Sequence, residues 1–286
     1  MLNRQEYPSL RQSLVGAWCP SLGASGYTLL DRSGCNQNGT LSGVAAGTAW
    51  PAIRGGLSLY GSTSALVSVP TTDALNPDRT DAFSVAGWAL IPTVGSNQTI
   101  VGNLEPSGSG FRGWEFQIDG AGSLLVLVVG TYSSSTIHVN SPTGAIAANA
   151  LYHVAATYDG SSSAAGVSLY VNGIRQTNTV VYNTLTTTTK STQPIRFFQR
   201  AAGGNQFTGY ADDLRFYRRV LKLAEIRLLA SRRGIGLSPL PYRTAGMPRK
   251  LYVNVGGTWR SGDAYVNTGS GWRLGIPSVN VGGTWK

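Results

Sequence analysis

The sequence of 286 residues has little cysteine, histidine or methionine, with two residues of each kind. Cys19 and Cys35 are too few for the disulfide framework that stabilises small secreted domains. The pair forms either one bridge or two free thiols, and the sequence leaves both open. The chain has no CxxC motif and no Cys/His cluster, so the residue spacing excludes a zinc site.

Long hydrophobic runs are also missing. No apolar stretch approaches the roughly 20 residues that a membrane-spanning helix needs. Residues 1–18, MLNRQEYPSLRQSLVGAW, lack the apolar core of about 7 to 15 residues that marks a signal peptide. We therefore expect no membrane insertion and no export through the general secretion route.

Acidic residues are scarce, with 13 Asp and Glu against 23 Lys and Arg, and the net charge is +10. Residues 1–214 hold 10 basic and 11 acidic residues, a net of −1, whereas residues 215–286 hold 13 and 2, a net of +11. Such asymmetry is typical of a surface that meets nucleic acid, an anionic polysaccharide or an acidic protein. The alternative is a set of solvated arginines on a connecting segment.

What the chain does have is β-strand pattern, with 42% hydrophobic residues and 37 glycines. Roughly a dozen short alternating segments, separated by Gly, Ser, Asn and Pro, predict two packed antiparallel sheets. Both faces of residues 83–91, FSVAGWALI, are apolar, which indicates a central strand. Asn172 and Gly173 lie between apolar residues and predict a two-residue hairpin turn with positive φ at both positions.

One segment has a helical pattern. In residues 221–234, LKLAEIRLLASRRG, apolar residues fall on one face, and we expect Arg232 and Arg233 in the last turn and Gly234 as the stop. The apolar positions are Leu223, Ile226 and Leu229 or Ala230. Three prolines follow without periodicity, which predicts a linker.

Four motifs in order resemble the concanavalin A-like lectin/glucanase superfamily, and in particular its LamG-like jelly-roll domains. They are SLVGAW with the loop DRSGCNQNG, FSVAGWAL, LYHVAATYDG with LYVNGIRQ, and FTGYADDLRFYRRVLKLAEIRLL. The resemblance covers residues 10–236 and implies an all-β, two-sheet antiparallel jelly-roll sandwich with one short C-terminal helix. We expect an N-terminal arm (1–12), the jelly roll (13–236), a linker (237–250) and a small β-repeat tail (251–286).

The sequence argues against catalysis. The glucanases of this superfamily place a nucleophile and an acid/base on one strand as Glu-x-Asp-x-x-Glu. Here Glu115 and Asp119 share a strand face, but no third carboxylate follows, and we expect Glu115 to be solvated. No Gly-x-Ser-x-Gly elbow joins a strand to a helix. His153 falls in a strand motif, where packing and hydrogen bonding are expected, so we predict that the protein is not an enzyme.

The resemblance implies a Ca²⁺ site, because these jelly rolls often hold one. Alternation places Asp212 with Leu214 and Phe216, facing inward, where an unpaired carboxylate is costly. Alternatively, hydrogen bonds or an arginine satisfy Asp212, and Asp31 only shapes an Asx turn. The predicted ligands are Asp31, Asn36, Asp212 and Asp213, with Asn38 as a further oxygen donor.

Glycan binding would need exposed aromatic side chains. Four aromatic residues could form a platform or could belong to the core, and the sequence does not decide between these. They are Trp50, Trp114, Tyr132 and Tyr182.

The chain ends on three copies of a nine-residue pattern, x-Val-Asn-x-Gly-x-x-Trp-Lys/Arg, which begin at Tyr252, Tyr265 and Ser278, thirteen residues apart. One copy cannot bury its own apolar face, so copies must stack on each other or on a partner. The predicted docking residues are Trp259, Trp272, Trp285, Arg249, Lys250, Arg260 and Arg273.

Such endings after a LamG-like domain resemble those of bacteriophage virion proteins. The resemblance implies a non-enzymatic virion surface protein, namely a capsid decoration, head fibre or tail adhesin, made in the host cytoplasm. Its expected partners are other virion proteins, further copies of itself and host-surface glycans. The alternatives are a secreted or cell-surface carbohydrate-binding protein, a glycoside hydrolase, and nucleic-acid binding through the basic tail.

Overall fold

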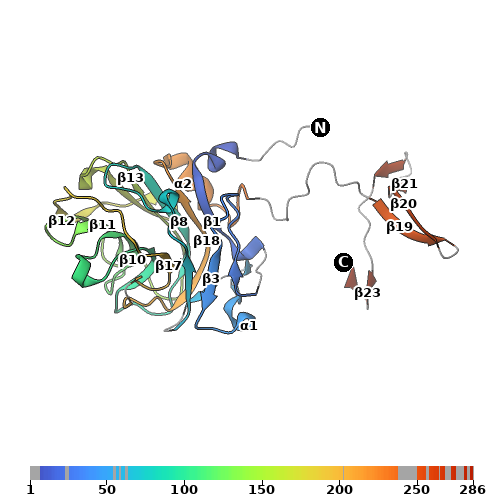
Figure 1. Cartoon of the computed structure of the whole chain (residues 1–286), viewed down its shortest axis with the longest axis horizontal. Coiled ribbons are helices and arrows are strands. Elements are labelled where there is room, and N and C mark those ends of the chain that lie inside the picture. The colour runs from blue at the N-terminus through green and yellow to red at the C-terminus, as the bar shows by residue number, and fades with distance from the viewer. Residues whose placement is uncertain are drawn as a thin grey trace. The chain divides into compact units, whose positions relative to one another are not determined.

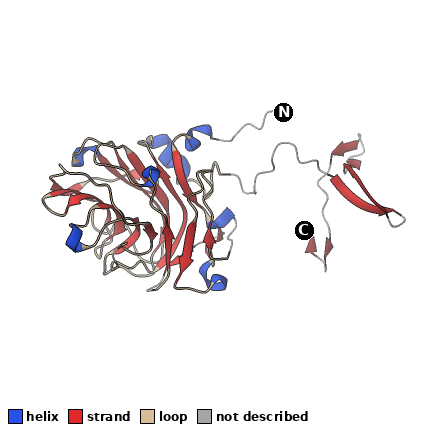
Figure 2. Ribbon diagram, viewed as in Figure 1, coloured by secondary structure: helices blue, strands red, loops and turns tan. Residues whose placement is uncertain are grey.

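The structure, a computed structural model, falls into two units, residues 1–239 and 240–286. It describes residues 7–22, 26–53, 56–57, 59–61, 64–201, 203–237, 250–255, 258–263, 265–267, 272–274, 280–281 and 284–285. The first unit consists mainly of β-strands in two antiparallel sheets, as the sequence predicts (Figure 1, Figure 2).

The seven-stranded sheet carries the central strand that the sequence predicts, because β8 pairs with both β13 and β18. Its order is β1 (Leu14–Trp18), β18 (Gly209–Tyr217), β8 (Phe83–Leu90), β13 (Leu151–Tyr158), β14 (Val167–Val171) and β15 (Ile174–Arg175), with β6 (Leu59–Gly61) also on β18.

The nine-stranded sheet forms the other layer. Its order is β16 (Thr179–Asn183), β12 (Ser135–Asn140), β11 (Leu124–Thr131), β10 (Gly113–Ile118), β9 (Gln98–Gly102), β17 (Ile195–Phe197), β7 (Leu66–Val69), β3 (Gly39–Ser42) and β2 (Thr28–Leu29). A separate pair joins β4 (Ala52–Ile53) to β5 (Gly56–Leu57).

Short helices complete the unit. The α-helices are α1 (Ala46–Ala49), which the sequence did not predict, and α2 (Leu223–Leu229); the 3-10 turns are η1 (Pro8–Arg11), η2 (Pro20–Leu22), η3 (Asp73–Leu75), η4 (Ser107–Ser109) and η5 (Ala164–Gly166). Helix α2 ends before Arg232, so Arg232 and Arg233 lie beyond its last turn. Ile226 and Leu229 are buried as predicted, but Leu223 is 41% exposed.

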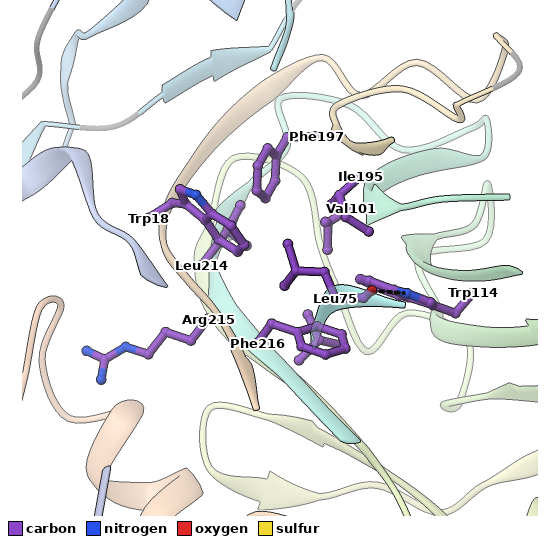
Figure 3. Close-up of a pocket in the computed structure, with 10 residues that line it drawn as sticks. Trp18, Leu75, Val101, Trp114, Ile195, Phe197, Leu214, Arg215 and Phe216 are labelled. Carbon is purple, nitrogen blue, oxygen red and sulfur yellow. Dashed lines mark hydrogen bonds between the residues drawn. The ribbon is translucent and has the colours of Figure 1, made fainter. Parts of the chain in front are cut away.

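The main core lies between the sheets and is rich in aromatic residues. The Phe216 ring packs at 5.5 Å from Phe83 and at 5.0 Å from Trp114, within the range of favourable aromatic pairs. A cavity of about 10 Å³ remains between Trp18, Leu75, Trp114 and Phe216 (Figure 3). Its apolar lining and its size, about one water molecule, make it a packing void rather than a ligand site.

A second core covers the other face of the seven-stranded sheet. Its buried residues come from η1, the sheet, α2 and the segment that follows α2, and they include Leu10, Ala86, Tyr217, Ile226 and Leu237. The prediction of a separate arm over residues 1–12 is wrong for residues 7–12, because Leu10 is fully buried and Arg11 Nε donates to the carbonyl of Gly236 at 3.0 Å. Leu237, assigned to the linker, is also buried.

Two local features fix the course of the strands. Asn172 and Gly173 adopt φ values of 50° and 77° between β14 and β15, which confirms the predicted hairpin turn. In β18, Asp212 lies opposite Trp88 and Arg215 lies opposite Ala86. An advance of three residues along β18 therefore matches an advance of two residues along β8, which is a β-bulge. The bulge contains Asp213, whose φ is 50°.

The bulge corrects the predicted orientation of Asp212. Ala86, on the partner strand, belongs to the second core, so Arg215 and Asp212 lie on that face as well. Leu214 and Phe216 face the main core. The Arg215 side chain points away from the cavity that Leu214 and Phe216 line (Figure 3).

The second unit contains three antiparallel hairpins, one for each repeat copy. They pair β19 (Lys250–Val255) with β20 (Thr258–Asp263), β21 (Tyr265–Asn267) with β22 (Trp272–Leu274), and β23 (Asn280–Val281) with β24 (Thr284–Trp285).

Candidate functional site

The nine-stranded sheet has a second face, called here the outer face, which points away from the main core. Tyr182 of β16 lies opposite His138 of β12. His138 lies opposite Leu127 of β11, and Leu127 lies opposite Glu115 of β10. Because opposed residues share a face, the four form one row. Their strand neighbours, such as Phe116, belong to the main core, so the row lies on the outer face.

Glu115 in this row is paired and buried. Its side chain is 0% exposed, and Arg200 Nη2 and Nε donate to its two carboxylate oxygens at 2.8 and 3.3 Å. Thr99 Oγ1 donates a further bond at 2.7 Å. The prediction that Glu115 is solvated is therefore wrong. With both of its oxygens held by Arg200 and Thr99, the buried Glu115 carboxylate is poorly placed to contact a substrate as a general acid.

Along the described strand β10, no second carboxylate shares the outer face with Glu115 for glycoside hydrolysis. The next residue of β10 on this face is Gln117, whose Oε1 accepts from Asn205 Nδ2 at 3.1 Å. Asp119 follows the strand and its Oδ1 accepts from the backbone N–H groups of Ala121 and Ser123 at 2.9 and 2.8 Å. Asp119 therefore closes a turn.

A line of ring contacts crosses the same face and is called here the aromatic strip: Phe111, Tyr132, Tyr182 and His138. The Arg200 guanidinium lies 5.2 Å from the Phe111 ring, and Phe111 contacts Tyr132 at 5.8 Å. Tyr132 meets Tyr182 edge-on at 5.6 Å, and Tyr182 lies 6.1 Å from His138. Tyr132 is 41% exposed, so the strip reaches solvent.

The strip contains two of the four aromatic residues considered for glycan binding. Tyr132 and Tyr182 lie together, whereas Trp114 is buried in the main core. Trp50 packs against that core, and its Nε1 donates to the carbonyl of Gly26 at 3.0 Å. Phe111, His138 and Arg200 were not predicted, because no local motif links residues from two loops and a strand.

His138 brings an imidazole to this strip. Burial lowers the pKa of His138, so its ring is neutral at pH 7. Neutral imidazole, phenol and aromatic surfaces suit uncharged polar ligands, and aromatic residues with a polar tip are common in binding surfaces.

Three of the four residues predicted for calcium, Asp31, Asp212 and Asp213, have other partners. The oxygens of Asp31 accept hydrogen bonds from the backbone N–H groups of Ala17, Ser33 and Gln37 and from Ser33 Oγ, at 2.7–3.0 Å. Asp31 thus shapes its loop, which was the alternative to a calcium ligand that the sequence left open for this residue. Asn36 has φ of 58° and is exposed in that loop.

The two aspartates of β18 are likewise engaged. Arg215 donates from Nε and Nη2 to both oxygens of Asp213, at 2.7 and 2.9 Å, and the Gly234 N–H adds a bond at 2.8 Å. Asp212 lies 3.4 Å from Arg233 and accepts from the Ser21 N–H at 3.3 Å. Over the described residues, no three Asp, Glu, His or Cys side chains gather to hold a metal ion, and the four predicted ligands do not fit one.

Asp212 and His153 lie in one buried row with Trp88 on the second-core face. Burial and the neighbouring Asp213 raise the pKa of Asp212 to about 6. Burial and the nearby Arg215 lower the pKa of His153 to about 3. His153 is therefore neutral and packs edge-on against Trp88 at 5.5 Å, in the structural role that the sequence predicts.

The two cysteines are free thiols. Cys19 is buried, and burial raises its thiol pKa, whereas Cys35 is exposed. No helix among the described residues has the length and apolar character needed to cross a membrane.

The positive charge of residues 215–286 is partly neutralised within the first unit. Each of four arginines there lies within 4.0 Å of a carboxylate: Arg215 with Asp213, Arg218 with Asp81, Arg219 with Glu225 and Arg233 with Asp212. The interpretation that residues 215–286 form one basic surface is therefore wrong for these four arginines. Residues 240–286 keep six basic residues against one acidic residue, a net charge of +5.

The predicted docking residues of the tail lie on the hairpins. They are Lys250 in β19, Trp259 and Arg260 in β20, Trp272 and Arg273 in β22, and Trp285 in β24, while Arg249 lies outside the described residues.

Comparison with known proteins agrees with the jelly-roll fold. The binding domain of Paraclostridial Mosquitocidal Protein 1 is 18% identical with a TM-score of 0.57, over 93% of this chain and 68% of that chain. The botulinum neurotoxin serotype G binding domain is 16% identical with a TM-score of 0.55, over 93% and 66%. At these identities the likeness concerns the fold alone.

A sialidase of Trypanosoma rangeli in complex with the inhibitor DANA is 17% identical with a TM-score of 0.54, over 79% of this chain. This chain spans 34% of that sialidase's length. No curated protein matches the sequence. A model of the laminin G family, described as concanavalin A-like lectin/glucanases superfamily, matches residues 61–227, which is more than half of the sequence. The chain therefore belongs to the concanavalin A-like lectin/glucanase superfamily.

Proposed function

We propose that this protein is a non-enzymatic recognition protein of a bacteriophage virion surface. Its jelly roll binds host-surface glycans through the aromatic strip, and its repeat tail attaches it to other virion proteins. It is made in the host cytoplasm and displayed on the particle as a capsid decoration, head fibre or tail adhesin, in several copies.

The observation that carries the recognition role is the arrangement around Glu115. Glu115, the carboxylate that comes nearest to the glucanase sequence pattern, is buried and held by Arg200, while Tyr132 of the aromatic strip is 41% exposed. An aromatic face without a free pair of carboxylates suits binding better than hydrolysis. The toxin domains that share the fold are described as binding domains, which is in keeping with this role.

The virion role is supported by the division of the chain. A jelly roll with its own core is followed by a separate unit of three hairpins, and the repeat resembles the endings of virion proteins. Six basic residues and three tryptophans suit this unit to an acidic protein surface, since Trp and Arg are enriched at interface hot spots.

The virion role is tested by mass spectrometry of purified phage particles from the host that produces this chain. We expect the chain in banded particles at a fixed ratio to the major capsid protein. A chain that is found only free and monomeric in the lysate would contradict the virion role and favour a secreted or cell-surface carbohydrate-binding protein.

The recognition role is tested on a glycan array with the full chain. We expect binding that the Tyr132→Ala and Tyr182→Ala variants lose, while the Tyr27→Ala variant keeps it. Tyr27 is a matched control because it is 56% exposed and lies outside the aromatic strip. Binding that survives the double variant would place recognition elsewhere.

A further inference from the structure

The three hairpins of the tail pair in one register. Asn254 lies opposite Trp259, Asn267 opposite Trp272 and Asn280 opposite Trp285. The next pair outward is Val253 with Arg260 in the first hairpin and Val266 with Arg273 in the second. Opposed residues share a face, so each hairpin places Asn and Trp on one face, and the first two place Val and Arg on the other.

The recurring residues are those of these pairs. Other positions differ among the copies: Tyr252 and Tyr265 correspond to Ser278, and Thr258 corresponds to Gly271. The repeat therefore preserves the Asn–Trp pair, the valine and one basic residue, together with the glycine that follows two positions after Asn.

A single two-stranded hairpin is at best marginally stable in water. The described strands of the tail pair within each hairpin as three separate two-stranded sheets, and the register puts the Asn–Trp pair of each hairpin on one face. A partner that covers this face would stabilise each hairpin in the same way.

Charge selects the class of partner. Residues 240–286 carry a net charge of +5, so the tails of two copies repel one another. An acidic surface is the complementary one. Each copy repeats one Trp and one basic residue, the composition of a protein interface hot spot, rather than the run of basic residues that tracks a phosphate backbone.

We infer that the three hairpins are equivalent docking units, and that together they bind an acidic protein surface that offers repeated sites, each unit through its Asn–Trp face. This inference rests on the proposed attachment role of the tail. It adds that attachment is trivalent, so that no single hairpin is enough to attach the chain to its partner.

Trivalency has a quantitative signature. Linking binding units raises avidity by about 10²–10⁴ over a single unit, without any new contact. Removing one unit of three therefore weakens binding by roughly tenfold or more, and the loss is similar whichever unit is removed.

The experiment uses particles of the phage that encodes this chain, purified from a mutant with an early stop codon in its gene. Fluorescently labelled full-length chain is added, and bound chain is measured by co-sedimentation. We expect Trp259→Ala, Trp272→Ala and Trp285→Ala each to lower affinity by a similar factor of about ten or more, and pairs of these changes to lower it further.

The Tyr252→Ser variant is the control, because the third copy has serine at this position, and we expect wild-type affinity. A control that binds as poorly as the Trp variants, or a single Trp variant that abolishes binding while the other two have no effect, would overturn trivalency. Binding that no Trp variant changes, but that deletion of residues 238–286 abolishes, would also overturn it while leaving the attachment role intact.

Two outcomes separate the inference from the proposed function. If the full chain does not bind the particles, or binds equally well without residues 238–286, the attachment role itself fails. Double-stranded DNA and an acidic capsid protein, added in solution at equal charge, are compared as competitors for binding of the labelled chain to the particles. If the DNA competes and the capsid protein does not, the partner is a nucleic acid and the inference of a protein partner is wrong.

Discussion

The guanidinium of Arg200 lies 2.8 Å from the carboxylate of Glu115, although 85 residues separate them in the sequence. Arg200 also lies over the Phe111 ring, so one side chain joins the buried carboxylate to the aromatic strip. Because of this pair, Glu115 supports the residues of the outer face on which we propose that glycans bind.

Replacing Arg200 tests this role. The Arg200→Ala change leaves Glu115 buried without its cation, and breaking such a pair costs about 3–5 kcal/mol in the free energy of unfolding. Urea denaturation measures the loss. The Arg175→Ala variant is the control, since Arg175 is exposed on β15 and a surface change stays within about 0.5 kcal/mol. Equal free energies of unfolding for the two variants would show that Arg200 does not stabilise the fold through Glu115.

Asp212 predicts a pH dependence of stability. Its pKa of about 6 lies above the ordinary value of 3.8, so unfolding releases its proton between these values, and its contribution to stability falls as pH rises from about 4 to 6. Relative to Asp212→Asn, the wild type should lose on the order of 2–3 kcal/mol between pH 4 and 7.

Thermal or urea unfolding at several pH values measures this difference. The Asp73→Asn variant is the control, because the Asp73 side chain is fully exposed. Parallel pH curves for the wild type and Asp212→Asn would show that Asp212 titrates in the native state as it does in the unfolded chain.

Calcium should not stabilise the fold. Internal donors already occupy the carboxylates of Asp31 and Asp213, and a ligand raises the melting temperature only when it binds the native state. We expect the same Tm in a chelator and in millimolar CaCl₂. A Tm that increases with calcium concentration would reinstate the calcium site.

The jelly roll should fold without the tail. Leu237 is the last buried residue among the described residues of the first unit, and that unit has its own two cores. Residues 1–237 should melt within about 3 °C of the full chain, because they include every described residue of the two cores. A truncated chain with no cooperative melting transition would mean that the tail completes the fold.

Much of the fold could be predicted because its signals are local. Alternation marked β8 as a central strand, Asn172–Gly173 marked a hairpin, and the repeat marked units that prove to be hairpins in one register. The candidate site could not be predicted, because its geometry depends on residues that are far apart in the sequence. One extra residue at Asp213 moves Asp212 to the other face of β18. Glu115 is paired with Arg200, which lies 85 residues further along the chain.

The central claim is a division of labour between a jelly roll that recognises and a tail that attaches. The most direct measurement compares the full chain with residues 1–237 in two binding assays, one on host cells and one on particles that lack the chain. The account predicts that residues 1–237 bind host cells as the full chain does and do not bind particles. Particle binding by residues 1–237, or loss of host-cell binding with the tail, would contradict it.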